Sequence, residues 1–391
     1  MKKIDLTIFL PTVLLAIFGL LMIYSTGGKD YLLKQSLWFG IAIAAMLLVS
    51  QVPMRGWYIL SPFLYILTIL MLILVLALPS TYPKRWLIFN GFSLQPSEFA
   101  KLGTISILAY YLIRKKKLEK FTDFVIPMII VLIPAGLIFI EPDFGAAQIF
   151  LPVMVVMLYW AGMPAEKIFV FFSPIISAIA SFSIYIWLSF MTLLAIYLYI
   201  RKKLGNIIYG FIANPLIGLM TPVIWNSLKT YQQKRIIAFL SPWFDPKGIS
   251  WQIIQSKIAI GSGRLFGKGF LSGTQKRLEF LPERHTDFIF SCIGEELGFI
   301  GIVITVLLYL YLFYRLLSVA KITKNRLGSL IIIGILTWFA YQTFINMGMT
   351  IGILPVTGVP LPFISYGGSA LLACFIAIGI SLSISKARYE Y

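Results

Sequence analysis

Histidine and cysteine are almost absent from this chain. Among its 391 residues there is one histidine, His285, and there are two cysteines, Cys292 and Cys374. The single histidine excludes Ser-His-Asp and Cys-His catalytic sites elsewhere in the chain, so a general base there must be a carboxylate or a lysine of perturbed pKa. Both cysteines fall in segments predicted to be helical, and they indicate neither a disulfide nor a metal site.

Charged residues are also scarce. They form 12% of the sequence, against 59% hydrophobic residues, and the mean hydropathy is +0.89. This composition excludes a soluble domain and predicts an all-α, polytopic integral membrane protein. The start, Met1-Lys2-Lys3 before a long apolar stretch without a small-residue cleavage site, predicts an uncleaved first span rather than a signal peptide.

Apolar segments of membrane-spanning length recur along the chain. With about 20 apolar residues per span, the sequence predicts about 12 transmembrane helices. They lie near residues 6–25, 33–51, 58–79, 97–113, 123–140, 146–162, 167–184, 186–200, 206–227, 287–314, 327–348 and 366–385. Basic clusters fall between alternate spans, at Lys2-Lys3, Arg55, Arg114 to Lys117, Lys167, Arg201 to Lys203, Arg315 to Arg326 and Lys386 to Arg388. The positive-inside rule then puts these clusters and both chain termini in the cytoplasm.

One basic segment breaks this rule. From Lys229 to Asp287 the chain has ten lysines and arginines against four aspartates and glutamates, all on the predicted outer side. A solvated basic loop would explain the segment, because long translocated loops escape the charge rule. The alternative is an anion site, in which the glycines of IGSGRLFGKGF (260–270) bring backbone N–H groups to a phosphate beside Arg264 and Lys268. Next to a membrane, this interpretation predicts a lipid-linked phosphate or diphosphate.

Asp287 is the first candidate for the reacting group. It lies within LPERHTDFIF (281–290), where the basic loop meets an apolar helix expected to begin at residue 287. Water, a substrate headgroup and lipid could therefore converge on this carboxylate. An aspartate normally titrates near ~4, and desolvation at the membrane edge would raise its pKa toward the value that a base needs at neutral pH.

Three further polar segments interrupt the apolar pattern. QPSEFAK (95–101) places Glu98 and Lys101 three residues apart near a helix start, either as a structural ion pair or as part of a site. EPDFG (141–145) is either a tight turn or a cavity-facing acidic pair that takes Lys101 or a loop arginine as its partner. GILPVTGVPLPFISYGGSA (352–370) contains prolines that forbid a regular helix, and we expect it to line the same chamber as the reacting carboxylate.

These motifs together resemble the SEDS (shape, elongation, division and sporulation) family of bacterial cell-wall polymerases, and its RodA branch in particular. The matching residues are KRW (84–86), QPSEFAK (95–101), EPDFG (141–145), IIQSKIAIGSG (253–263), GKGFLSGTQKRLEFLPERHTDFIF (267–290) and LPVTGVPLPFISYGGSA (354–370). The resemblance implies one membrane domain over residues 1–391, similar to other multi-span transferases that use polyprenyl-linked sugars. The family usually has ten spans, so the three apolar segments within 167–227 imply a two-helix insertion before the long extracytoplasmic loop at 229–286.

The resemblance also assigns roles to single residues. Asp287 matches the family's essential acidic residue, which implies the general base. Positions associated with the family's central cavity are matched by Trp86, Glu98, Lys101, Asp143, Gln232 and Arg235. The matching loop motifs add three members to the candidate substrate-binding set, Lys257, Lys268 and Thr274. Trp86 could equally be an ordinary tryptophan of the membrane interface.

The implied activity is peptidoglycan glycosyl transfer at the outer face of the bacterial cytoplasmic membrane during cell elongation. Lipid II is the implied substrate, undecaprenyl diphosphate the leaving group, and a class B penicillin-binding protein, the elongation machinery and membrane lipid the implied partners. The reaction calls for no organic cofactor and no nucleic acid, and it admits a divalent cation, Mg²⁺ or Mn²⁺, held by carboxylates. Two other functions stay open, a lipid II flippase and a non-catalytic scaffold for the penicillin-binding protein. A transporter needs no carboxylate at its outer mouth, which favours the transferase.

Overall fold

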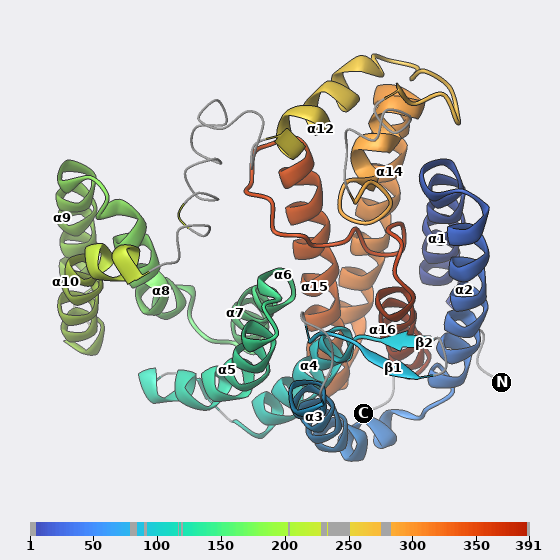
Figure 1. The fold of residues 1–391 in the computed structure, drawn as a ribbon. Coiled ribbons are helices and arrows are strands. Elements are labelled where there is room, and N and C mark those ends of the chain that lie inside the picture. Colours follow the sequence, from blue (N-terminus) through green and yellow to red (C-terminus); the bar gives the residue numbers. More distant parts are fainter. Residues whose placement is uncertain are drawn as a thin grey trace.

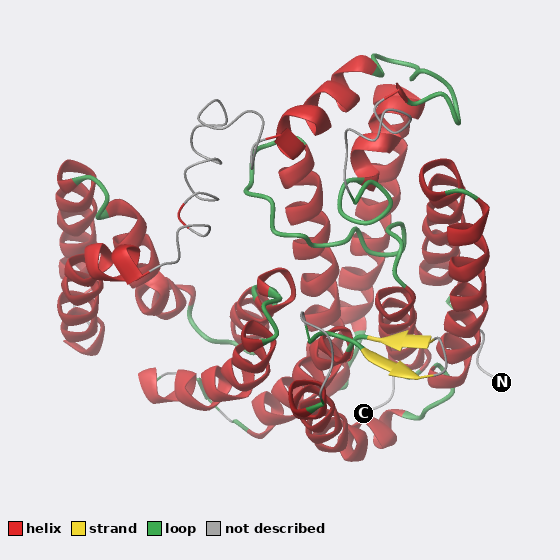
Figure 2. Ribbon diagram, viewed as in Figure 1, coloured by secondary structure: helices red, strands yellow, loops and turns green. Residues whose placement is uncertain are grey.

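The chain folds into a bundle of helices with one short β-hairpin (Figure 1 and Figure 2). The computed structural model describes residues 5–78, 84–89, 92–115, 117–118, 120–201, 204–227, 233, 251–274 and 283–388. The helices are α1 (Leu6–Gly27), α2 (Lys29–Val49), α3 (Met54–Ala77), α4 (Pro96–Arg114), η1 (Phe121–Phe124), α5 (Val125–Ile140), α6 (Phe144–Ala147), α7 (Phe150–Trp160), α8 (Ala165–Ala180), α9 (Ile184–Arg201), α10 (Leu204–Ser227), α12 (Trp251–Ser262), α14 (Ile289–Ile322), α15 (Arg326–Thr350) and α16 (Gly368–Lys386). The hairpin pairs β1 (Leu87–Phe89) with β2 (Phe92–Leu94) in antiparallel orientation.

Every predicted span has a helix at its position, so the all-α, multi-pass membrane class is confirmed. Within the described ranges, nine helices are long and apolar enough to cross a membrane. Among the predicted spans the exceptions are α4, which carries Glu98, Lys101 and Arg114, and the shorter α7 and α8, of 11 and 16 residues. The helix predicted to begin at residue 287 begins at Ile289, because the preceding residues form a turn closed by hydrogen bonds to the carbonyl of Glu283.

The centre of the bundle is formed by α15 and α16. Most side chains along both helices are buried, and Trp338, Phe339 and Phe375 have no exposed surface. α14 packs against α15 and α1, α16 packs against α2, and α4 packs against both α3 and α15. The segment 351–367 leads from the end of α15 to α16 without regular secondary structure, and much of its second half is buried (Figure 2). Irregular backbone can lie inside a membrane protein in this way only where other parts of the protein or a cavity cover it.

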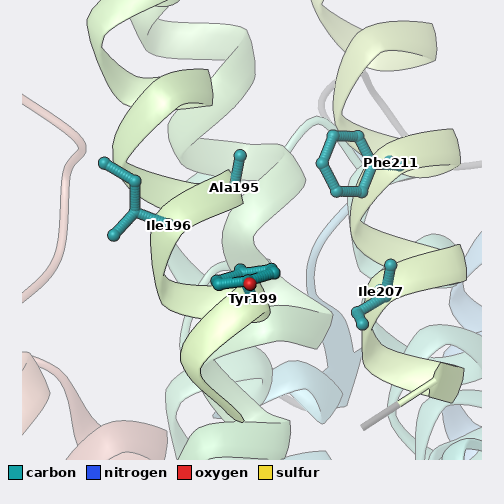
Figure 3. Close-up of a pocket in the computed structure, with 5 residues that line it drawn as sticks. All are labelled: Ala195, Ile196, Tyr199, Ile207 and Phe211. Carbon is teal, nitrogen blue, oxygen red and sulfur yellow. The ribbon is translucent and has the colours of Figure 1, made fainter. Parts of the chain in front are cut away.

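Helices α8, α9 and α10 form a separate group at one side of the bundle (Figure 1). They share a small apolar core around Val170, Leu194 and Leu198. A buried amide also joins α10 to α8, because Asn214 Nδ2 donates to Ser173 Oγ over 2.9 Å. All three predicted apolar segments of 167–227 are therefore helices. Between α9 and α10 lies an open cavity of about 380 Å³, drawn in Figure 3, whose lining is apolar apart from the hydroxyl of Tyr199.

The residues after α12 close over a kink in α14. Gly298 has a φ of 66°, which interrupts the helix and frees backbone groups on both sides of it. The loop supplies the missing partners: Lys268 N donates to Glu295 O over 2.9 Å, and Phe299 N donates to Arg264 O over 2.8 Å. A side chain at Gly298 would meet the loop backbone, since its Cβ would lie 2.3 Å from Gly267 N. This contact joins the loop after α12 to α14, the helix whose first turn follows Asp287.

Candidate functional site

Asp287 lies in a turn just before α14, outside the membrane-spanning part of that helix. Its backbone N–H donates to Glu283 O over 3.1 Å, and its side chain is partly buried. The carboxylate faces the segment 351–367, because a Cβ built on Gly358 would lie 3.3 Å from Asp287 Oδ2. The structure therefore places the proline-rich segment 351–367 against the carboxylate of Asp287, as the sequence predicts.

The acidic turn between α5 and α6 reaches the same segment from another side. Asp143 caps α6, since its Oδ1 accepts a hydrogen bond of 3.1 Å from Ala146 N, and its Oδ2 accepts one of 2.9 Å from Gln95 Nε2. The turn packs closely on the proline-rich segment, because a Cβ on Gly145 would lie 2.6 Å from Thr357 O. Residues 143–145 and Asp287 thus both lie against 357–358.

Arg85 is the cation of this site. Its Nε donates to Glu141 O over 3.1 Å, and its Nη2 donates to Pro142 O. The sequence predicted Lys101 or an arginine of the basic loop as the partner of the acidic turn. For Lys101 that prediction is wrong, because its ammonium bonds Glu98 instead.

The electrostatic surroundings set the protonation of two carboxyl groups here. Burial raises the pKa of Asp287 to about 7, with further increases from the charges of Glu283 and Asp143, against lowering by a hydrogen bond from Thr286 and by the charge of Arg85. Burial also raises the pKa of Glu141 to about 8, again helped by Asp143 and opposed by Arg85. At neutral pH, Asp287 is therefore ionised in a large fraction of molecules, whereas Glu141 is mostly protonated.

Glu98 and Lys101 form a buried ion pair inside the bundle. Lys101 Nζ lies 2.7 Å from Glu98 Oε1, and the two residues are 2% and 4% exposed. The ammonium also lies 5.0 Å from the centre of the Trp338 ring, which adds a cation–π contact. These contacts favour the structural interpretation of the pair, and its role in substrate binding stays a prediction. Trp86, which is 40% exposed next to Arg85, is free to take either of its predicted roles.

The predicted phosphate cradle at 260–270 is largely occupied by the protein itself. Lys268 Nζ donates to Glu295 Oε1 over 2.8 Å and to Thr274 Oγ1 over 2.7 Å, and Thr274 N donates to the same Glu295 oxygen over 2.7 Å. These contacts give Lys268 and Thr274 structural partners and do not favour the phosphate contact predicted for Lys268. The substrate-binding role predicted for both residues stays a prediction. Lys257 on α12 is exposed and lies against Gly352. Gln232 and Arg235 lie outside the described residues.

A metal site made by the protein alone does not emerge from the part of the chain that the structure describes. There, no group of three or more histidine, cysteine, aspartate or glutamate side chains is arranged to hold an ion. Asp143 and Asp287 are nevertheless close enough for their charges to interact. Mg²⁺ is commonly held by one or two carboxylates together with substrate phosphates. The donors present thus fit a cation that arrives with a diphosphate.

Three residues that contact the acidic turn or the Asp287 turn were not predicted from the sequence as members of the site. Arg85 stands beside Trp86 in KRW, and Gln95 opens QPSEFAK, so both were inside recognised motifs. Their contacts with residues 141–143 could not be inferred because they join segments about 50 positions apart. Asn346 is a buried amide within the apolar helix α15. The sequence could have indicated Asn346, because burying a polar side chain in a membrane helix costs free energy and such residues usually have a function.

Two lysines of the candidate set should respond differently to the same substitution. Lys268→Met removes the ammonium that lies 2.8 Å from the buried carboxylate of Glu295, and should destabilise the fold by about 1–3 kcal/mol. Lys257→Met should leave thermal unfolding unchanged because that side chain is exposed. Thermal unfolding of the two purified variants in detergent measures the difference. A Lys268→Met protein with wild-type stability and weakened substrate binding would restore the phosphate-ligand interpretation.

Comparison with known proteins points to a single family. A family model for FtsW, RodA and SpoVE, described as cell cycle protein, matches residues 5–204 and 180–390. The peptidoglycan glycosyltransferase RodA of Treponema pallidum (strain Nichols) is 34% identical, over 97% of this chain and 97% of that protein. The peptidoglycan glycosyltransferase MrdB of Escherichia coli (strain K12) is also 34% identical, over 98% of this chain and 94% of that protein.

Solved structures share the fold. A chain from a peptidoglycan synthase complex, described as coordinating polymerization and crosslinking, superposes with a TM-score of 0.77 at 25% identity and full coverage of both chains. The rod shape determining protein RodA of Thermus thermophilus superposes with a TM-score of 0.67 at 23% identity, over 100% of this chain and 99% of that one.

Proposed function

This chain belongs to the FtsW, RodA and SpoVE family of cell cycle proteins, and we propose that it polymerises lipid II as a peptidoglycan glycosyltransferase whose general base is Asp287. The observation that carries the proposal is the position of this carboxylate. It lies just before the N-terminal end of the membrane helix α14, partly buried, beside a second carboxylate and an arginine, with its pKa raised to about 7. A base is most effective when its pKa is near the working pH.

The reaction requires one proton transfer and one departing group. A hydroxyl of the acceptor sugar attacks the anomeric carbon of the donor, and a new glycosidic C–O bond forms. Asp287 accepts the hydroxyl proton. The bond from the anomeric carbon to the diphosphate oxygen breaks, and undecaprenyl diphosphate leaves with the bonding electrons. The proline-rich segment lies beside the carboxylate at Gly358 and covers part of it, which limits the access of competing water.

The charge that develops on the diphosphate needs cations near the acidic turn. Arg85 is held there by its bonds to Glu141 O and Pro142 O, which leaves other N–H groups of its guanidinium available. Lys257 is a second cation, on α12 at the outer face, for which the exposed ammonium supports a role in substrate binding. Asp143 would hold Mg²⁺ or Mn²⁺ together with the diphosphate, which leaves Asp287 free to accept the proton, and the ion would neutralise phosphate charge.

The basic residues at one end of the bundle support an orientation of the protein in the membrane. Asp5 near the N-terminus lies 3.4 Å from Arg388 near the C-terminus and 4.0 Å from Arg315. Both ends of the described chain therefore lie on the same side, and its arginines favour the cytoplasm. We place Asp287 at the outer face of the bacterial cytoplasmic membrane. The synthase-complex neighbour supports a class B penicillin-binding protein, within the elongation machinery, as the partner.

Asp287→Asn is the variant that tests the base. The change is nearly isosteric and removes the proton acceptor, and general-base catalysis contributes roughly 10²–10⁴-fold. Glycan strands made from labelled lipid II by the purified protein in liposomes should therefore fall by about 100-fold or more. Binding of lipid II should stay within a few-fold of wild type.

His285→Ala is the control for this variant, because His285 lies two residues away and packs on the rings of Tyr31 and Tyr366. It should cost much less activity than Asp287→Asn. Near-normal polymerisation by the Asp287→Asn protein, with the partner absent, would remove Asp287 from the mechanism. Asp143 would then be the next carboxylate to test.

The pH profile of polymerisation should be bell-shaped. The rate should rise with pH through about 7, because Asp287 accepts a proton only when it is ionised. It should fall above about 8, because Glu141 then ionises and adds negative charge beside Asp143. Glu141→Gln, which stays neutral, should keep the rising limb and lose the falling one. Initial rates across this pH range measure both limbs, and a wild-type rate that does not change through pH 7 would contradict the assignment.

A further inference from the structure

Backbone carbonyls of the turn that carries Asp287 accept hydrogen bonds from residues within 346–366. His285 O accepts a hydrogen bond of 2.9 Å from Tyr366 N. Thr286 O accepts one of 2.6 Å from Ser365 Oγ. Asp287 O accepts one of 2.9 Å from Asn346 Nδ2. Three consecutive carbonyls of the turn are thus held by residues from α15 and from the segment before α16.

Asn346 differs from the other two donors because it donates two hydrogen bonds. Its Nδ2 also donates to Val359 O over 2.8 Å, and the side chain has no exposed surface. A primary amide has two N–H groups, so both are used on carbonyls that belong to different segments. Val359 follows Gly358, which faces the carboxylate of Asp287. The amide of Asn346 therefore holds both the turn that carries Asp287 and the segment 351–367 that packs against it.

We propose that Asn346 is a positioning residue for glycosyl transfer, which holds Asp287 at a fixed distance from the 351–367 wall; this rests on the proposed function. A general base works within about 2.6–3.2 Å of the proton that it removes. A displacement of about 1 Å can cost roughly 100-fold in rate. Asn346 is suited to prevent such a displacement because it sits on α15, one of the most buried helices of the bundle.

The bonds that Asn346 makes require a donor and no charge. Both acceptors are carbonyl oxygens, which a carboxylate at this position would repel. Asn346→Asp keeps the shape of the side chain, loses the paired donors and should separate the turn from the wall. Asn346→Ser keeps one hydroxyl donor and cannot reach both carbonyls. Its turnover rate should therefore lie between the rates of the wild type and of Asn346→Asp.

A matched control lies one turn earlier on the same helix. Gln342 is also a buried amide, and its Nε2 donates to Pro360 O over 2.9 Å, while its Oε1 accepts from Trp338 Nε1 over 2.6 Å. It anchors the same irregular segment without touching the Asp287 turn. Gln342→Glu therefore reproduces the loss of an anchoring amide without the loss of the bond to Asp287 O.

The test measures the turnover rate, the apparent affinity for lipid II and thermal unfolding of each full-length variant in liposomes. Asn346→Asp should lower the turnover rate by about 100-fold, with lipid II affinity within a few-fold of wild type. Gln342→Glu should stay within a few-fold of the wild-type turnover rate. Equal losses in the two variants would show a general structural role and overturn the proposal. If Asn346→Asp does not fold, Asn346→Ser takes its place in the same comparison.

A double-mutant cycle with Asp287→Asn separates positioning from stability. If Asn346 acts through Asp287, its replacement should change the residual rate of the Asp287→Asn protein by less than a few-fold, because the base is already absent. A further 100-fold loss in that background would mean that Asn346 acts independently, against the proposal. An active Asp287→Asn protein would refute the proposed base, whereas an inactive one beside a fully active Asn346→Asp protein would refute only the positioning role.

Discussion

The partial removal of Asp287 from water is the interaction on which the rest of the site depends. An aspartate in water titrates near ~4 and holds a proton poorly at neutral pH. Burial in the turn before α14 raises the pKa to about 7, and Arg85 limits the rise by favouring the ionised form. The proline-rich segment supplies the cover, and the acidic turn supplies the neighbouring charge. In the proposed mechanism, the proline-rich segment and the acidic turn act through the carboxylate that lies between them.

The buried carboxylates of this protein differ in how they are compensated. Glu98 is paired with Lys101, Glu295 with Lys268, and Glu296 with the hydroxyl of Ser25 at 2.6 Å. Such compensated groups hold helices and loops together, and breaking the pairs would leave uncompensated charge inside the protein. Within the described structure, both side-chain oxygens of Glu141 are buried without a hydrogen-bond partner. Protonation compensates this residue instead, which keeps a further negative charge out of the site.

The sequence predicted the helices well because a membrane span is a property of about 20 consecutive residues. The site was predicted as far as single motifs allow. Asp287, the acidic turn and the proline-rich segment were each identified, and the structure brings them together at Gly358. The partners of individual side chains were harder to predict because they depend on contacts between segments that are distant in the sequence. Lys268 shows this limit, since its charge in a glycine-rich loop suggested a phosphate, whereas the fold places Glu295 beside it.

The central claim is that Asp287 touches the acceptor sugar while cations near the acidic turn hold the diphosphate. The most direct measurement is an electron cryomicroscopy structure of the protein in a lipid nanodisc with lipid II and a non-reactive donor analogue. The account predicts an acceptor hydroxyl within about 3.2 Å of the Asp287 carboxylate. It also predicts diphosphate density beside Arg85. Substrate bound with its anomeric carbon far from Asp287, or with its diphosphate away from the 141–145 turn, would contradict it.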